Sequence, residues 1–289
     1  SDFLHYLQTV LILPFFGYLR KERPDVIIAT HFSPPKFINR MQKKLDARMM
    51  VVVTDMRAHP LWVTAGILHY FVSLECARDD LVHLGVSPQA VTAGVVPLRP
   101  GFLRCHEPKT VFEKYGLPQR PTVLFFSSLR GVFPYCAEAL PQLLASCNVI
   151  IIYGNNRSLA AYLRTIENDS LFYCARCDTI WELMEISSVI VGKPGGLTVF
   201  EGIYKKKPFI FTHYIPGQEK QNMDFLVAEG VARFVDSAAA LIDAVAYFVE
   251  AQPALHRRYP LTLHEITPAL RSAISGPKNR SDVSGEHEG

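Results

Sequence analysis

Nine short apolar segments, each bounded by turn residues, constrain the fold of this chain more than any other feature. Most of them are β-branched or aromatic on both faces, and segments with helical patterning separate them. Strands without polar alternation must be covered on both faces, which is typical of parallel sheets flanked by helices. The sequence therefore predicts doubly wound α/β domains. The predicted strands are Val26–Ala29, Met50–Val53, Tyr70–Ser73, Thr92–Val95, Val123–Phe126, Val149–Tyr153, Leu171–Tyr173, Val189–Val191 and Phe209–Thr212.

A linker divides these strands into two groups. Val96–Phe102 contains two prolines and a glycine, and a polar stretch follows it. A chain of 289 residues with 49% hydrophobic side chains can bury two cores. We expect a front domain over residues 1–103 and a rear domain over residues 104–271. Residues 272–289 are nearly free of large apolar side chains and are expected to be a disordered tail. The sequence leaves open whether residues 251–270 form a helix that packs back across the domain junction.

Charge is small overall but unevenly spread. The net charge of +3 is too small to indicate a strongly basic nucleic-acid-binding surface. Residues 1–104 carry 12 Lys and Arg against 8 Asp and Glu, whereas the rest of the chain carries 18 against 19. The basic excess lies beside apolar runs, notably Phe3–Leu19, which is too short and too interrupted to span a membrane. This pattern is compatible with docking on an anionic membrane surface, and equally with two solvated helix ends.

Six cysteines without a pairing pattern indicate reduced thiols rather than a disulfide framework. Cys174 and Cys177 have the spacing of a metal or redox pair. Neither a second pair nor a histidine at zinc-finger spacing accompanies them.

The segment from Val189 to Glu201 has the pattern strand, glycine-containing turn, helix. Such a turn presents backbone N–H groups at the carboxyl end of the sheet, where a diphosphate can bind. Gly195 and Gly196 would let the backbone approach it closely, Thr198 can cap the helix or bind a phosphate, and Glu201 can accept from a ribose diol. An ordinary strand-to-helix turn with a surface glutamate is the alternative.

The next predicted strand ends in a polar loop that should leave the same edge of the sheet. Gln218, Glu219 and Asn222 would then point into the same crevice, where amides and a carboxylate suit the hydroxyls of a sugar. A helix N-cap cluster is the alternative explanation. Together, the two loops predict a nucleotide-sugar site.

Two runs, Gly192–Glu201 and Tyr214–Asn222, closely resemble the donor signature of the diacylglycerol glycosyltransferases. This family includes monogalactosyldiacylglycerol synthase and the processive diacylglycerol glucosyltransferases, and it is related to the peptidoglycan glycosyltransferase MurG. In the front domain the similar motifs are Pro24–His31, Val53–Asp55 with His59 and Trp62 downstream, and Gly94–Phe102.

The resemblance implies the GT-B architecture of two facing doubly wound domains. It also implies transfer of a hexose from a UDP-sugar to a membrane lipid such as diacylglycerol, with inversion and without a metal or other cofactor. The sequence contains no Asp-x-Asp motif. A peripheral position on the cytoplasmic face of a membrane is expected.

By the same resemblance, the predicted donor-site residues receive roles. Gly195, Gly196 and Thr198 would hold the diphosphate, Glu201 the ribose, and Gln218, Glu219 and Asn222 the donor sugar. The turn at Gly154 and Asn155 would border the nucleotide base.

The chain departs from the family pattern at two places. Relatives begin with a strand and a glycine-rich loop that carries the favoured general base, a histidine, so the front domain is expected to be partial. In the rear domain, Ser127–Gly131 stands where relatives have a glycine-rich turn, which would weaken donor binding or replace backbone contacts by side chains.

Asp55, His59 and His31 are the candidate bases, with a structural histidine as the alternative. Trp62, together with His59, is expected on the acceptor side at a lipid-facing surface, unless it is a core residue. Two other functions stay open: a nucleotide-sugar-binding protein without catalysis, and MurG-like transfer to a polyprenol-linked acceptor.

Overall fold

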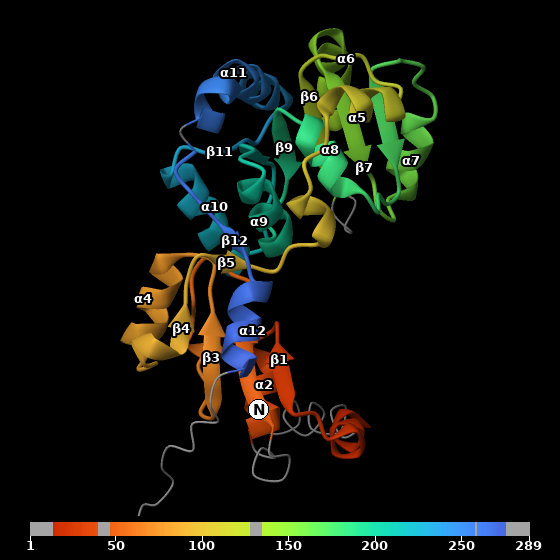
Figure 1. Ribbon diagram of the computed structural model, residues 1–289. Helices are drawn as coiled ribbons and strands as arrows, with labels where there is room; N and C mark the ends of the chain where they lie inside the picture. The colour runs from red at the N-terminus through yellow and green to blue at the C-terminus, as the bar shows by residue number, and fades with distance from the viewer. Residues whose placement is uncertain (1–13, 40–46, 128–134, 258, 276–289) are drawn as a thin grey trace, which may run out of the picture.

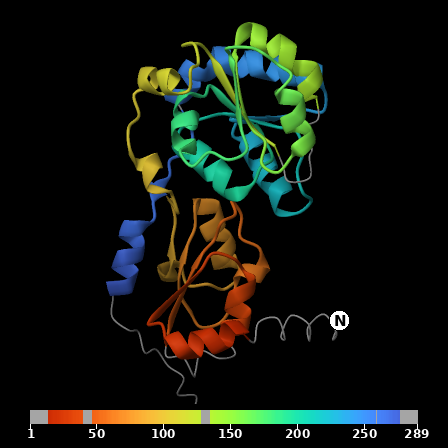
Figure 2. The same cartoon turned by 90° about the vertical axis from the view of Figure 1, so that its right-hand side faces the viewer.

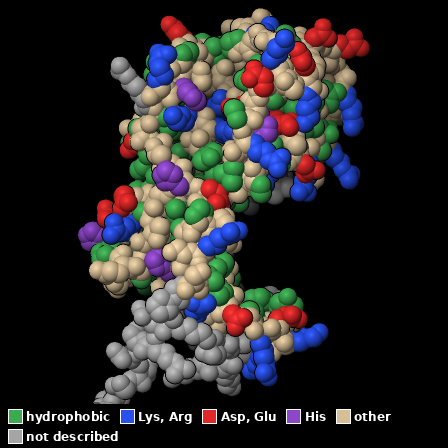
Figure 3. All heavy atoms as spheres, in the orientation of Figure 1, with side chains coloured by type: hydrophobic (Ala, Val, Ile, Leu, Met, Phe, Trp, Pro, Cys, Tyr) green, Lys and Arg blue, Asp and Glu red, His purple; other side chains and the backbone are tan. Residues whose placement is uncertain are grey.

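The computed structural model describes residues 14–39, 47–127, 135–257 and 259–275. Two α/β units, each built on a parallel sheet, face each other across a narrow waist (Figure 1). Positive and negative side chains are interspersed over the visible face of the rear unit (Figure 3). The predicted fold class is confirmed.

The front sheet has the order β1-β2-β3-β4, and all its strand pairs are parallel. Helix α4 covers one face through Leu81, which packs with Val51 and Tyr70. The strands are β1 (Val26–Ala29), β2 (Arg48–Val52), β3 (Ile67–Phe71) and β4 (Val91–Thr92). The helical segments are α2 (Ser33–Asn39), η1 (Pro60–Trp62), α4 (Glu75–His83), η2 (Pro88–Ala90) and, in the linker, η3 (Pro100–Leu103).

The rear sheet has the order β11-β10-β9-β6-β7-β8 and is also parallel. Alternate residues face opposite sides, so Leu124 and Ile190 join one core while Val123 and Val189 join the other. Its strands are β6 (Thr122–Phe126), β7 (Asn148–Ile152), β8 (Leu171–Cys174), β9 (Val189–Gly192), β10 (Phe209–Phe211) and β11 (Ala232–Phe234).

Helices cover both faces of the rear sheet, as strands without polar alternation require. One core takes side chains from α5, α8, α9 and α10, and the other from α6, α7 and α11. The helices are α5 (Pro108–Lys114), α6 (Cys136–Ser146), α7 (Arg157–Leu163), α8 (Ile180–Ile186), α9 (Gly196–Tyr204), α10 (Gln218–Ala228) and α11 (Ala238–Arg257).

Eight of the nine predicted strands are present with boundaries shifted by at most three residues. The remaining prediction, a single strand over Thr92–Val95, is wrong. Gly94 has a φ of 79° there, and this turn separates β4 from β5 (Val95–Val96), which pairs in a different sheet. Strand β11 was not predicted, because it is short and has an arginine in its middle.

The C-terminal segment returns to the front unit. Strand β12 (His264–Glu265) pairs with β5, and α12 (Thr267–Ser275) lays Leu270 and Ile274 against the core of the front sheet (Figure 2). The division at residue 271 therefore differs from the structure, which packs α12 on the front sheet. Residues 272–275 are helical rather than part of a tail, and 276–289 lie outside the described residues.

The predicted N-terminal helix is described only in part. Residues 3–13 lie outside the described part of the chain, and residues 14–22 are helical. Leu19 is buried there beside Phe16 and Ile38. Among the described helices, α11 alone is long and apolar enough to cross a membrane, but its Leu241 and Phe248 pack in the rear core.

The two units touch where α9 begins. A Cβ built on Gly196 would lie 2.3 Å from the carbonyl oxygen of Thr54, which belongs to the front unit. A Cβ on the neighbouring Gly195 would meet only the Lys193 side chain, at 3.6 Å. The contact between the units therefore requires glycine at position 196 and not at 195.

Gly196→Ala should weaken the contact between the two units by about 1–3 kcal/mol, because the added methyl overlaps a backbone oxygen. Small-angle scattering should show a larger radius of gyration for this variant. Gly195→Ala is the matched control and should scatter like the unchanged protein. Equal scattering from all three proteins would contradict the contact.

Candidate active site between the two domains

The predicted site residues lie at the carboxyl ends of parallel strands. Strand β9 leads through a short turn into α9, and β10 leads through a loop into α10. Because β9 and β10 are parallel neighbours, both loops leave the same edge of the rear sheet. The loop after β2, which carries Asp55 and His59, meets them from the front unit through contacts with Gln218 and Asn222.

Helix α9 presents unpaired backbone amides to this crevice. Gly195 is its N-cap and no side chain caps it. The N–H groups of Gly196, Leu197 and Thr198 belong to the first turn and have no carbonyl partner within the helix. Thr198 lies inside this turn, so it does not cap the helix. The end of α9 thus offers N–H donors and the positive end of a dipole to an anion.

Glu201 is held by an arginine of the linker. The Arg99 Nε and Nη2 atoms donate to Glu201 Oε1 at 3.1 and 2.8 Å. Burial raises the pKa of the Glu201 carboxyl, and the bond and charge of Arg99 oppose this shift. The Arg99 guanidinium also lies over the rings of Phe102 and Trp181. The carboxylate predicted to bind ribose is thus occupied by a protein cation.

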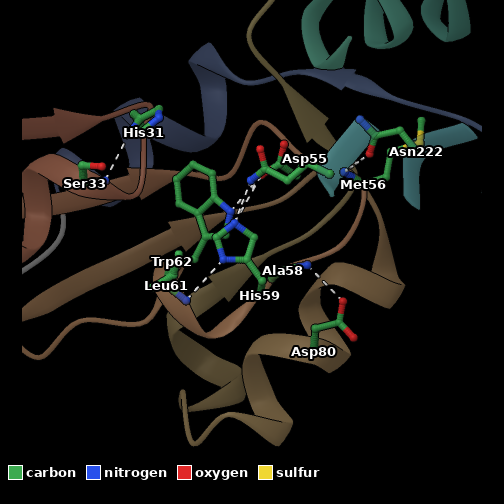
Figure 4. Close-up of polar contacts among 11 residues, drawn as sticks. His31, Ser33, Asp55, Met56, Ala58, His59, Leu61, Trp62, Asp80 and Asn222 are labelled. Carbon is green, nitrogen blue, oxygen red and sulfur yellow. Dashed lines mark hydrogen bonds and ion pairs between the residues drawn. The ribbon is translucent and has the colours of Figure 1, made fainter. Parts of the chain in front are cut away.

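The three residues predicted to bind the donor sugar also have protein partners. Asn222 is 2% exposed, and its Oδ1 accepts from the Met56 N–H at 3.2 Å (Figure 4). Its Nδ2 donates to the Pro194 carbonyl at 3.1 Å. Glu219 pairs with Lys193 and accepts from the Ile215 N–H. Asn222 therefore joins the turn before α9 to the front unit.

Gln218 completes a cross-domain cluster with Asp55, His59 and Trp62. Its Nε2 lies 2.7 Å from Asp55 Oδ2 and 2.7 Å from His59 Nε2. Figure 4 shows the Asp55, His59 and Trp62 side chains converging from the front unit. The structure thus joins a predicted donor-sugar residue directly to two of the three candidate bases.

The expectation that Trp62 lies on a lipid-facing surface is wrong. Its side chain is buried, 1% exposed, and packs with Val51 and Tyr70 in the core of the front unit. The indole Nε1 donates to Asp55 Oδ2 at 2.9 Å. Trp62 therefore holds the Asp55 carboxyl in place through a hydrogen bond from the core of the front unit.

The hydrogen bonds of His59 favour Asp55 as the base. His59 Nδ1 accepts from the Leu61 N–H at 3.2 Å, so the proton of the neutral ring lies on Nε2. Nε2 then lacks the lone pair that a base needs, and it cannot accept from Gln218. Burial lowers the pKa of His59 and raises that of Asp55, whose shift is opposed by Trp62 and by the charge of His59.

His31 lies apart from the cross-domain cluster. Its Nδ1 accepts from the Ser33 N–H at 3.2 Å, and its ring stacks on Phe32 with a centroid distance of 4.2 Å. No hydrogen bond joins it to Gln218, Asp55 or His59 within the described residues. It is thus the weakest of the three candidate bases.

Gly154 and Asn155 follow β7 and line a cavity of about 490 Å³ together with Arg157 and Arg164. The Gly154 N–H donates to the Ala175 carbonyl at 3.0 Å, which joins this turn to the loop after β8. Residues 128–134 lie outside the described part of the chain, so the expectation for Ser127–Gly131 stays a prediction. The described residues contain no group of three or more His, Cys, Asp or Glu side chains placed to hold a metal ion.

Arg99→Ala should lower the free energy of unfolding at neutral pH by about 1–3 kcal/mol, because it leaves the Glu201 carboxylate buried without a cation. A carboxyl whose pKa is raised by folding stabilises most when protonated, and this contribution is lost as pH rises through the folded pKa. The loss in Arg99→Ala should therefore shrink as pH falls through that pKa. Urea unfolding at several pH values measures both effects.

Arg78→Ala is the matched control, since Arg78 pairs with the exposed Glu75 one helical turn away. Such exposed pairs contribute about 0–1 kcal/mol. A loss in Arg99→Ala that is as small as this control, or that grows toward low pH, would contradict the role given to Arg99.

Comparison with known proteins relates the chain to one family. Residues 2–97 match the monogalactosyldiacylglycerol (MGDG) synthase family. Processive diacylglycerol beta-glucosyltransferases match over most of the chain: that of Staphylococcus epidermidis is 27% identical over 78% of this chain and 60% of its own length. That of Bacillus subtilis is 27% identical over 82% of this chain and 64% of its own length. The chain thus spans about three fifths of the length of these relatives.

Solved structures share the fold at low identity. The structure described as "S. aureus MnaA-UDP co-structure" is 12% identical, with a TM-score of 0.65, and the match covers 90% of this chain and 76% of that one. Such a likeness shows the GT-B fold of two facing Rossmann-like domains. The chain is thus similar to the processive diacylglycerol beta-glucosyltransferases over most of its length and, over residues 2–97, to the monogalactosyldiacylglycerol synthase family.

Proposed function

We propose that this chain is a glycosyltransferase that moves a hexose from a UDP-sugar to the hydroxyl of a membrane lipid such as diacylglycerol. One observation carries the proposal: Gln218, on the donor side, contacts the buried carboxyl Asp55 of the front unit at 2.7 Å. The proposed base and the amide proposed to bind the donor sugar therefore lie within hydrogen-bond distance of each other.

The donor half of the proposal rests on α9 and α10. The first-turn amides of α9 would bind the diphosphate, and Glu201 would accept from the ribose diol once Arg99 releases it. Gln218 would turn from Asp55 to the hexose hydroxyls, with Glu219 and Asn222 beside it. The relatives are named for a glucosyl transfer, which supports a hexose donor.

The reaction follows from these positions. The acceptor hydroxyl attacks the anomeric carbon while the bond to the UDP oxygen breaks, and the hydroxyl proton passes to the Asp55 carboxylate. Charge that develops on the leaving diphosphate meets the N–H groups of α9, which are fixed before the reaction. A single displacement inverts the anomeric configuration, and the cradle of amides supplies the stabilisation without a metal.

We also propose that the protein acts peripherally on the cytoplasmic face of an anionic membrane. The basic excess of the front third supports this position. In the helix formed by residues 14–22, Phe15 and Tyr18 are exposed while Leu19 is buried, so aromatic side chains are available to a bilayer surface.

The alternative of a binding protein without catalysis would use the same donor residues. Gln218, Glu219, Asn222 and Glu201 all have protein partners in this structure. A donor must displace at least the partners of Gln218 and Glu201. MurG-like transfer to a polyprenol-linked acceptor has no observation of its own here.

Incubation of the chain with UDP-glucose or UDP-galactose and vesicles containing diacylglycerol should yield a glycosyl diacylglycerol, detected by mass spectrometry. Asp55→Asn should lower kcat by at least about 100-fold, because it removes the proton acceptor. It should leave UDP affinity within about twofold. The rate should fall as pH falls through the raised pKa of Asp55, because protonation removes the base.

Asp79→Asn is the control, since Asp79 is exposed on α4.

Glu201→Ala should weaken UDP binding in a titration. UDP binding without any lipid product would overturn the proposal in favour of the binding protein, and product from a polyprenol-linked acceptor alone would favour MurG-like transfer. Full activity in Asp55→Asn would overturn the role of Asp55.

A further inference from the structure

A pair of cysteines lies outside the site described above. Cys174 is the last residue of β8, at the edge of the rear sheet, and Cys177 follows in the turn before α8. Both are half-buried and free, and each side chain shifts the pKa of the other. The two cysteines thus share the short turn that connects β8 to α8.

Polar groups from three elements surround Cys177. Its Sγ lies 3.7 Å from the Thr179 hydroxyl and 4.0 Å from the Tyr115 hydroxyl. The Tyr115 hydroxyl also contacts Thr179 at 2.8 Å and Glu182 at 2.9 Å. A carboxylate only accepts, so the one Tyr115 proton goes to Glu182, and Thr179 is left to donate to its neighbours.

The charges around this turn are compensated. Lys114 on α5 pairs with Glu182 on α8 at 2.6 Å, and Arg176 pairs with Asp178 at 3.4 Å on the exposed side of the turn. A thiolate at Cys177 therefore faces hydrogen-bond donors and no uncompensated carboxylate. The interaction with the Cys174 thiol lowers the pKa of Cys177 to about 6, helped by Thr179 and opposed by burial. The same interaction raises the pKa of Cys174.

The remaining described cysteines lack this arrangement. Cys147 is buried in the rear core, and Cys105 is exposed. Burial raises the pKa of Cys76, which donates to the Met56 carbonyl. Among the cysteines whose side chains the structure describes, Cys177 alone combines access, donors and a second thiol within reach.

We propose that Cys174 and Cys177 form a dithiol site that exchanges with low-molecular-weight disulfides such as glutathione disulfide. The Cys177 thiolate attacks one sulfur of that disulfide, forms a mixed disulfide and releases one glutathione thiolate. The Cys174 thiol then gives up its proton and attacks the Cys177 sulfur, which releases the second glutathione. The protein loses two electrons and two protons, and two glutathione thiols are formed.

The position of this turn links it to the nucleotide side of the rear unit. The Ala175 carbonyl, between the two cysteines, accepts from the Gly154 N–H at 3.0 Å. The Cys174 carbonyl accepts from the Tyr153 N–H at 3.0 Å. A disulfide between Cys174 and Cys177 would therefore close a turn that is hydrogen-bonded directly to the turn at Gly154.

The test is treatment of a Cys105→Ser background with glutathione disulfide at pH 7, followed by mass spectrometry of tryptic peptides. The background protein should form a bond between Cys174 and Cys177 and keep no glutathione. Cys174→Ser should instead hold one glutathione on Cys177, because the resolving thiol is missing. Cys177→Ser should react at Cys174 at least about 10-fold more slowly. Absence of both the Cys174–Cys177 bond and the Cys177 adduct would overturn the proposal.

A second measurement separates a reactive thiolate from mere exposure. The rate of Cys177 alkylation by iodoacetamide should be half-maximal near pH 6 and should not rise further above about pH 7. Thr179→Val should move this midpoint to higher pH, whereas Thr165→Val, a matched change elsewhere in the rear unit, should not. A rate that keeps rising to pH 8.5 in the background protein would also overturn the proposal.

Discussion

The hydrogen bond between Gln218 and Asp55 is the contact on which the account of this protein depends. It joins the loop after β10 in the rear unit to the loop after β2 in the front unit. Asn222 adds a second bond to the same front loop through Met56, and Gly196 lets the Thr54 carbonyl approach α9. Because these contacts come from the predicted donor residues themselves, the side chains that join the two units are also those proposed to bind the donor.

In this arrangement of the two units, the ionisable groups of the site differ in how fully they are hydrogen-bonded or charge-paired. Trp62 and Gln218 hold the Asp55 carboxyl in a buried place that raises its pKa, which suits a group that must accept a proton. The neutral His59 ring accepts at Nδ1 and carries its proton on Nε2, so it forms no hydrogen bond with the Gln218 amide in this tautomer. Arg99 neutralises Glu201 from the linker. In the proposed complex, a nucleotide sugar would replace Gln218 at Asp55 and Arg99 at Glu201.

The parts of the fold that depend on chain-local patterns were predictable from the sequence. The apolar strands without polar alternation predicted both sheets, and the pattern of strand, turn and helix around Gly196 predicted the turn before α9. Contacts between distant segments were not predictable. Periodicity carries no information about the approach of Arg99 to Glu201, the return of α12 to the front sheet, or the burial of Trp62 behind Asp55. In each case the partner lies in a different part of the chain or on an opposite face, and tertiary packing decides the outcome.

The most direct measurement is an experimental structure of the chain with a bound UDP-hexose. We expect the diphosphate on the first-turn amides of α9, the ribose on Glu201 with Arg99 displaced, and the hexose between Gln218 and Asp55. A nucleotide in the cavity lined by Arg157 and Arg164, with the bond between Gln218 and Asp55 intact, would contradict it.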